Sequence, residues 1–183
     1  YADLGAAAFG LKARVGLLRD TGATLSAFNA WVATQGLDTL SLRVDKHNEN
    51  AKAVAEYLDQ NPKVAKVNFA GLPNSPWYPI KEKLNLKYTG SVLSFDLEVG
   101  DRSPDEAKDL AWAFIDALRL HSNLANIGDV RSLVVHPATT THSQSTEENL
   151  TSAGISQATV RLSVGIEDID DILNDLKQAF EAI

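Results

Sequence analysis

The sequence predicts an α+β fold: a four-stranded, mostly antiparallel sheet with helices on one face, preceded by a helical segment. Apolar residues recur at helical spacing over residues 1–60, whereas short segments of alternating apolar residues separate helices over residues 61–183. The strands are short and unevenly spaced, which favours an α+β sandwich over a regular parallel sheet. We therefore expect two parts, a helical segment at 1–60 and an α+β domain at 61–183.

Three helices are expected in the first part. Apolar residues at helical spacing predict a helix over 3–18. A second, nearly all-apolar helix covers 25–36, with Gly36 as the glycine that ends it. Asp38 is expected to cap a third, long helix that reaches about Leu58. The inner side of that helix is predicted to carry Leu40, Val44, Ala51, Val54, Ala55 and Leu58.

Four strands and four helices are expected in the second part. Ser103, Pro104 and Glu106 have the spacing of a capping box with proline in the first turn, so a helix should begin there. Glu147 and Glu148, Glu167 and Asp168, and Asp170 and Asp171 are interpreted as acidic helix N-termini rather than acid–base pairs. The predicted strands lie within 63–71, 91–99, 130–136 and 158–166, and the predicted helices within 79–86, 103–120, 145–154 and 167–183.

Charge and composition exclude several classes of function. The 183 residues carry a formal net charge of -7, without the basic face of a nucleic-acid binder. No apolar run approaches the ~20 residues that span a membrane. Cysteine is absent, which removes disulfides, thiolate zinc sites and a cysteine nucleophile and fits a cytoplasmic protein. Methionine is also absent and the chain begins at Tyr1, so we expect a piece of a longer protein.

Arg161 is the most informative charged residue. In the strand "TVRLSVG", Arg161 and Ser163 share one face, while Val160, Leu162 and Val164 share the other. An arginine in such a strand keeps its proton and needs a partner. Its planar guanidinium suits a carboxylate, which can belong to a ligand or to a nearby Asp or Glu of the chain.

Two loops carry the remaining polar candidates. Asn126 begins "NIGD", where Gly128 can let backbone amides approach a ligand; the alternative is an Asx-type turn that leads into a strand. The segment "SLVVHPATTTHSQS" places His136 and His142 around a run of threonines. Their spacing is not that of a metal site, and we interpret both histidines as structural, with hydrogen bonds to backbone carbonyls of a turn.

Three long segments resemble motifs of one protein family, and they follow one another along the chain in the order that the family has. They are "LLRDTGATLSAFNAWVATQGLDTLSLRVDKHNENAKAVAEYL", "LANIGDVRSLVVHPATTTHSQ" and "VRLSVGIEDIDDILNDL". They resemble the C-terminal half of the pyridoxal-phosphate (PLP) enzymes of cysteine and methionine metabolism, which have fold type I. Asn126-Ile127-Gly128 is similar to the sulfhydrylases, since the γ-lyases and cystathionine synthases usually carry Ser-Leu-Gly there. Ala27 and Trp31 depart from the "LSPFNAF" that is typical of the sulfhydrylases.

The resemblance implies a PLP-dependent transferase that exchanges the acetate of O-acetylhomoserine for sulfide to give homocysteine in methionine biosynthesis. It implies that Arg161 binds the α-carboxylate of the substrate, and that Asn126 and Thr141 line the same pocket. Residues 1–60 would then be the end of a large domain and a long connecting helix. The intact enzymes of the family usually form homotetramers.

The resemblance also places the Schiff-base lysine and most of the PLP site upstream of this chain. Lys12 is the nearest lysine, but "GLKAR" does not match the family's motif. This chain alone should therefore not catalyse. Two other functions stay open: a cystathionine γ-synthase or γ-lyase of the same family, and a non-catalytic amino-acid-binding or oligomerisation module.

Overall fold

The structure, a computed structural model, describes residues 2–183 and contains two compact units. The first reaches Ser41, and the second runs from Leu42 to Ile183. The division at residue 60 that the sequence predicts follows secondary structure, and it stays a prediction. The unit boundary falls earlier because the long helix packs its second half into the core of the second unit.

The first unit is helical throughout most of its length, as predicted. Gly5, at φ 50, interrupts the helical turns near the start. Large apolar side chains lie on its surface, among them Phe9 at 87% and Leu17 at 74% exposure. The elements are the 3-10 helix η1 (Ala2–Ala7), α1 (Ala8–Lys12), the π-helix η2 (Ala13–Leu18), α2 (Arg19–Thr21) and α3 (Ala27–Asp38).

Two predicted helix ends are wrong. Gly36 lies inside α3, which begins at the Ser26 cap and continues to Asp38. Asp38 therefore ends a helix rather than capping the next one, and α4 runs over Leu40–Asp59. A glycine can stand inside a helix at a cost of about 1 kcal/mol relative to alanine, so its presence alone does not fix a helix end.

The long helix α4 meets the core only through its second half. Ala51, Val54, Ala55 and Leu58 are fully buried, as predicted. Leu40 and Val44 were predicted on the same inner side, but they are 44% and 41% exposed because they precede the part of α4 that contacts the sheet. The predicted inner side of α4 is therefore correct for residues 51–58 and wrong for the first turns of the helix.

The second unit is an α+β sandwich around one sheet, as predicted. The sheet has five strands in the order β1-β2-β5-β4-β3, and every pair is antiparallel except β3 with β4. The strands are β1 (Val64–Asn68), β2 (Val92–Leu97), β3 (Ser122–Asn123), β4 (Leu133–Val135) and β5 (Thr159–Ser163). The prediction of four strands omitted β3, because two residues carry no alternation pattern.

The remaining helices of the second unit lie close to their predicted positions. The capping box at Ser103 and Glu106 is present. The helix that it begins ends at Ala117 rather than about Leu120. These elements are α5 (Tyr78–Lys83), α6 (Pro104–Ala117), η3 (Pro137–Thr139), α7 (Glu147–Ser152) and α8 (Ile169–Glu181). None of the helices described over 2–183 is long and apolar enough to cross a membrane.

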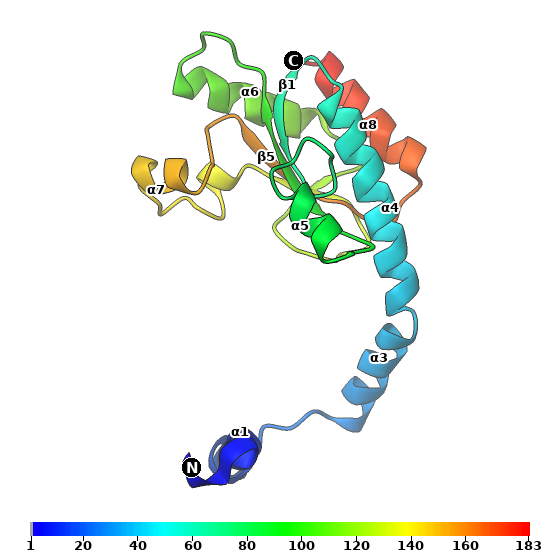
Figure 1. Cartoon of the computed structure of the whole chain (residues 1–183), viewed down its shortest axis with the longest axis vertical. Coiled ribbons are helices and arrows are strands. Elements are labelled where there is room, and N and C mark those ends of the chain that lie inside the picture. Colours follow the sequence, from blue (N-terminus) through cyan, green and yellow to red (C-terminus); the bar gives the residue numbers. More distant parts are fainter. Residues whose placement is uncertain (1) are drawn as a thin grey trace. The chain divides into compact units, whose positions relative to one another are not determined.

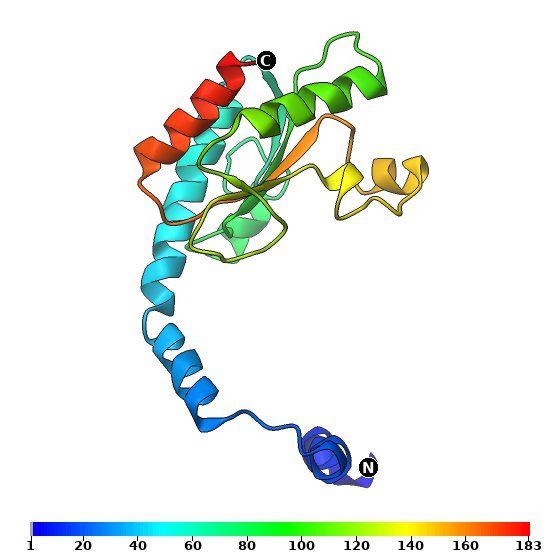
Figure 2. The same ribbon diagram turned by 180° about the vertical axis from the view of Figure 1, so that it is seen from behind.

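One face of the sheet is apolar and is covered by α4, α6 and α8, as Figures 1 and 2 show from opposite sides. Phe95 of β2 contacts Phe114 of α6 edge-on, with ring centroids 5.7 Å apart, and Phe114 lies 4.6 Å from Phe180 of α8. Such aromatic pairs add about 0.5–1.5 kcal/mol beyond the burial of their area. This three-ring cluster joins the sheet to two helices.

Asp175 of α8 fixes the end of α6. Its carboxylate accepts hydrogen bonds from the backbone amides of Arg119, Leu120 and His121, and from the His121 ring at 2.8 Å. Burial raises the pKa of this carboxyl, but the hydrogen bonds from His121, Arg119 and Leu120 outweigh burial and hold the pKa well below its usual value. The folded state therefore favours the ionised carboxylate.

We expect Asp175→Asn to lower the free energy of unfolding by about 3 kcal/mol, because an amide cannot accept from all of these donors. The folded pKa of Asp175 is lowered, so its contribution to stability is present above about pH 4 and is lost as the pH falls further. Urea unfolding at pH 7 and at pH 3 checks both statements, with exposed Asp116→Asn as the control. An equal, pH-independent effect of the two substitutions would contradict this account of Asp175.

Candidate functional site

The second face of the sheet is polar at its centre. The strand register places Asn68, Ser94 and Arg161 side by side on β1, β2 and β5, with Val135 of β4 next in the row. On β5, Val160, Leu162 and Val164 are fully buried on the opposite face. The predicted division of this strand into an apolar and a polar face is therefore confirmed.

Arg161 is half-buried and its guanidinium reaches the loop that follows β3. Its Nη2 donates a hydrogen bond to the carbonyl oxygen of Asn126 at 3.2 Å. No ion pair that the structure describes over 2–183 includes Arg161. A guanidinium has five N–H donors, so most of them can serve a ligand. The structure thus brings Arg161 and Asn126 together, and among residues 2–183 it gives the positive charge of Arg161 no carboxylate partner.

The loop around Asn126 is ordered by local hydrogen bonds. The Asn126 Oδ1 accepts from the amide of Ile127 at 2.8 Å, and the Asp129 Oδ1 accepts from the amide of Arg131 at 3.0 Å. The Asx-type turn that leads into the strand therefore forms three residues after Asn126, at Asp129. Gly128 has φ 82, a left-handed conformation that glycine adopts without strain.

Thr141 is exposed in the loop that follows η3. Its hydroxyl lies 2.9 Å from the Nδ1 of the neighbouring His142. The hydrogen bonds of the described chain join Arg161 to Asn126 but do not join Thr141 to either residue. The assignment of Thr141 to a shared pocket stays a prediction.

His136 is buried and structural, as predicted. Its Nε2 lies 2.9 Å from the carbonyl oxygen of Gln157, and its Nδ1 lies 2.8 Å from the hydroxyl of Thr139. Because a carbonyl can only accept, Nε2 carries the proton and Nδ1 accepts from Thr139. Burial lowers the pKa of His136, the bond to Gln157 opposes this, and the charge of Lys108 lowers the pKa further. His136 thus joins the end of β4 to the start of β5.

The turn between β5 and α8 is held from two sides. From α4, the His47 ring lies 2.7 Å from the Val164 carbonyl oxygen, and the Asn50 amide donates to the carbonyls of Gly165 and Glu167. From the other side, a Cβ on Gly165 would lie 2.5 Å from the Ser132 amide nitrogen, so only glycine fits. This packing fixes the end of the strand that carries Arg161.

Glu167 has a different role from the one predicted. Asp168 caps α8 by accepting from the amide of Asp170, whereas the Glu167 side chain bonds to a residue near β4. Its carboxylate accepts from the amide of Ser132 at 2.6 Å and from the Ser132 hydroxyl at 2.9 Å. Glu167 directly precedes the cap of α8, but its hydrogen bonds go to Ser132, a contact that its interpretation as part of an acidic helix N-terminus does not include. An acidic residue before a helix has the same pattern in either role, so no local signal could have predicted the contact with Ser132.

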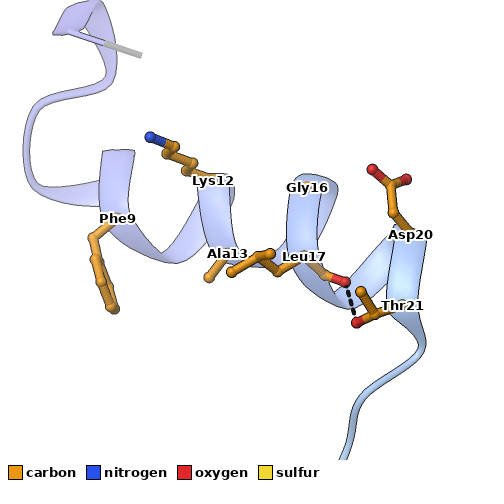
Figure 3. Close-up of a pocket in the computed structure, with 7 residues that line it drawn as sticks. All are labelled: Phe9, Lys12, Ala13, Gly16, Leu17, Asp20 and Thr21. Carbon is orange, nitrogen blue, oxygen red and sulfur yellow. Dashed lines mark hydrogen bonds between the residues drawn. The ribbon is translucent and has the colours of Figure 1, made fainter.

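Lys12 lies beside a surface groove in the first unit (Figure 3). The residues that line it come from consecutive helical turns of one short stretch: Phe9, Lys12, Ala13, Gly16, Leu17, Asp20 and Thr21. The lining is apolar apart from Lys12, Asp20 and Thr21, and all of it comes from residues 9–21. The groove therefore does not have the enclosed geometry of a built cofactor site.

The fold and the site define a class of domain, an α+β sandwich that presents an arginine and an amide-bearing loop on the polar face of its sheet. The chain belongs to the Cys/Met metabolism PLP-dependent enzyme family, whose model matches residues 5–181. It is 72% identical, over its whole length, to an O-acetyl-L-homoserine sulfhydrylase of Corynebacterium glutamicum, and 39% identical over 94% of its length to an O-succinylhomoserine sulfhydrylase of Pseudomonas aeruginosa.

A solved structure shows the same fold. A putative O-acetylhomoserine (thiol)-lyase from Campylobacter jejuni, which contains N'-pyridoxyl-lysine-5'-monophosphate, matches with a TM-score of 0.83 and 40% identity over 94% of the chain. The chain spans 40% and 41% of the length of the two curated relatives and 39% of the solved chain. It therefore corresponds to part of each of these proteins.

We expect His136 to titrate below the ordinary histidine pKa of about 6.5 and to carry its proton on Nε2 when neutral. Because the folded pKa is lowered, the neutral ring contributes stability that is present above about pH 6.5 and is lost as the pH falls below that value. Nitrogen-15 NMR of the ring reports both the tautomer and the titration midpoint. An Nδ1–H tautomer, or a midpoint at or above 6.5, would contradict the assigned hydrogen bonds.

Proposed function

We propose that this chain is part of a PLP-dependent O-acetylhomoserine sulfhydrylase and supplies the site for the α-carboxylate of the amino-acid substrate. The enzyme would replace the acetate of O-acetylhomoserine by sulfide and give homocysteine, a step of methionine biosynthesis. The observation that carries the proposal is the unneutralised guanidinium of Arg161, held beside Asn126 on the polar face of the sheet. A fixed arginine of this kind suits bidentate binding of a carboxylate.

The described residues offer a guanidinium for the carboxylate of the substrate, while several of the described lysines already have partners of their own. Among them, Lys63, Lys81, Lys87 and Lys108 are bound to backbone carbonyls or carboxylates. Lys12 borders only the open groove of Figure 3. The proposal therefore assigns the Schiff-base lysine and the PLP site to the part of the enzyme outside this chain. PLP itself supplies the electron sink for the reaction.

Arg161 and Asn126 have a positioning role in this proposal. When the guanidinium holds the carboxylate, it fixes the α-carbon of the substrate relative to the catalytic groups in the part of the enzyme outside this chain. Such orientation lowers the activation barrier of the reaction. Thr141 is proposed to line the same pocket once the substrate is bound. None of these three side chains transfers a proton in this account.

The apolar surface of the first unit also supports the proposal. The ring centroids of Phe28 and Trp31 in α3 lie 6.0 Å apart, and the two side chains are 69% and 59% exposed. Exposed apolar patches of this kind mark surfaces that another protein chain, or another region of the same protein, covers. Since the chain spans about 40% of the relatives' length, we propose that the rest of the enzyme covers this surface in a cytoplasmic homotetramer.

In the intact enzyme, Arg161→Ala should raise the KM for O-acetylhomoserine roughly 30- to 150-fold, the effect of losing about 2–3 kcal/mol of a charge-assisted hydrogen-bonded pair. The PLP content should not change, because the cofactor is bound elsewhere. Steady-state kinetics with the exposed Arg102→Ala as a control test this. An unaltered KM for Arg161→Ala would remove Arg161 from the substrate site.

The sulfur donor distinguishes the proposed activity from that of a cystathionine γ-synthase. We expect the intact enzyme to use sulfide efficiently and cysteine poorly with O-acetylhomoserine. Measurement of kcat/KM for both donors, and with O-succinylhomoserine in place of the acetyl ester, identifies both substrates. A preference for cysteine would contradict the proposed sulfhydrylase, while a lack of any turnover by the cofactor-loaded intact protein would favour a non-catalytic amino-acid-binding module.

A further inference from the structure

The carboxylate of Glu167 lies where the turn after β5 meets the base of the loop that carries Asn126. Its two oxygens accept from the backbone amide and the hydroxyl of Ser132, at 2.6 and 2.9 Å. The Ser132 hydroxyl oxygen in turn accepts from the amide of Gly165 at 2.9 Å. Ser132 is fully buried and Glu167 is half-buried, so the bond between Ser132 and Gly165 is shielded from water and the two bonds to Glu167 are shielded in part.

Backbone hydrogen bonds hold both ends of the loop formed by residues 124–131, and the bond at the second end lies next to the contacts between Glu167 and Ser132. At its first end, the Leu124 amide donates to the Val134 carbonyl at 3.2 Å. At its second end, the Ile166 amide donates to the Val130 carbonyl at 2.9 Å, directly beside Ser132. Between these ends, the Asn126 carbonyl receives the hydrogen bond from Arg161. The position of Asn126 relative to Arg161 is therefore set by the ends of the loop.

We propose that Glu167 is a positioning residue for the carboxylate site, and that it acts through Ser132 to hold the 124–131 loop against Arg161. Glu167 does not touch the substrate in this account. This inference rests on the proposed function, because it assigns Glu167 to the same site. It predicts that the contribution of Glu167 to substrate binding exists only while Arg161 is present.

A double-mutant cycle in the intact enzyme tests the inference. Glu167→Gln retains one acceptor for the Ser132 amide but presents an NH2 group where the Ser132 hydroxyl needs an acceptor. We expect it to raise the KM for O-acetylhomoserine about tenfold, with kcat changed less than about threefold and the PLP content unchanged. With Arg161→Ala already present, Glu167→Gln should add less than about twofold, because the two residues act as one unit.

Two further variants keep the test independent of stability. Glu181→Gln, at the exposed end of α8, makes the same chemical change away from the site and should leave the KM unaltered. Ser132→Ala removes the hydroxyl that bridges Glu167 and Gly165, and should reproduce the rise in KM if Glu167→Gln does not fold.

A carboxamide analogue of the substrate, tested as a competitive inhibitor, should bind the Glu167→Gln enzyme and the unsubstituted enzyme equally well.

The outcomes separate the inference from the proposed function. If Arg161→Ala raises the KM while Glu167→Gln and Ser132→Ala leave it unchanged, or if the effects of Arg161→Ala and Glu167→Gln multiply in the double variant, the positioning role of Glu167 is wrong and the carboxylate site stands. If Arg161→Ala leaves the KM unaltered, the proposed function fails and the role of Glu167 fails with it.

Discussion

The turn between β5 and α8 is the point on which the second unit depends. His47 and Asn50 of α4 bind the carbonyls of Val164, Gly165 and Glu167, while the Glu167 side chain binds Ser132 beside β4. Gly165 has no room for a side chain between these groups. A long helix, two strands and a loop are thus joined through a few buried and part-buried hydrogen bonds, and those that are buried would be costly to leave unmade.

This constraint explains why a short strand can hold a charged side chain in a defined place. One face of β5 packs into the core against α4, α6 and α8, and this fixes the register with β2 and β4. Side chains alternate along a strand, so Arg161 has to point to the other face. There the chain provides a carbonyl from Asn126 and no carboxylate in the described ion pairs, an arrangement that suits an anionic ligand of small size.

Periodicity was sufficient to predict much of the fold, and it failed where contacts distant in sequence decide the structure. Alternation in "TVRLSVG" predicted the two faces of β5, and the spacing of Ser103 and Glu106 predicted the start of α6. The strand β3 has only two residues, and Gly36 fits a helix interior as well as a helix end, so neither was predicted correctly. Arg161 and Asn126 were predicted as candidates, and the structure brings them together, but the roles of these residues and of Thr141 stay predictions. The contact between Glu167 and Ser132 joins residues 35 positions apart, which no local pattern encodes.

The central claim is that Arg161 and Asn126 receive the α-carboxylate of an amino-acid substrate. A crystal structure of the intact enzyme with PLP and a bound, unreactive analogue of O-acetylhomoserine tests this claim most directly. We expect two hydrogen bonds between the guanidinium of Arg161 and the α-carboxylate, with Asn126 at the same carboxylate. A carboxylate bound by other residues, with Arg161 still donating only to the Asn126 carbonyl, would contradict it.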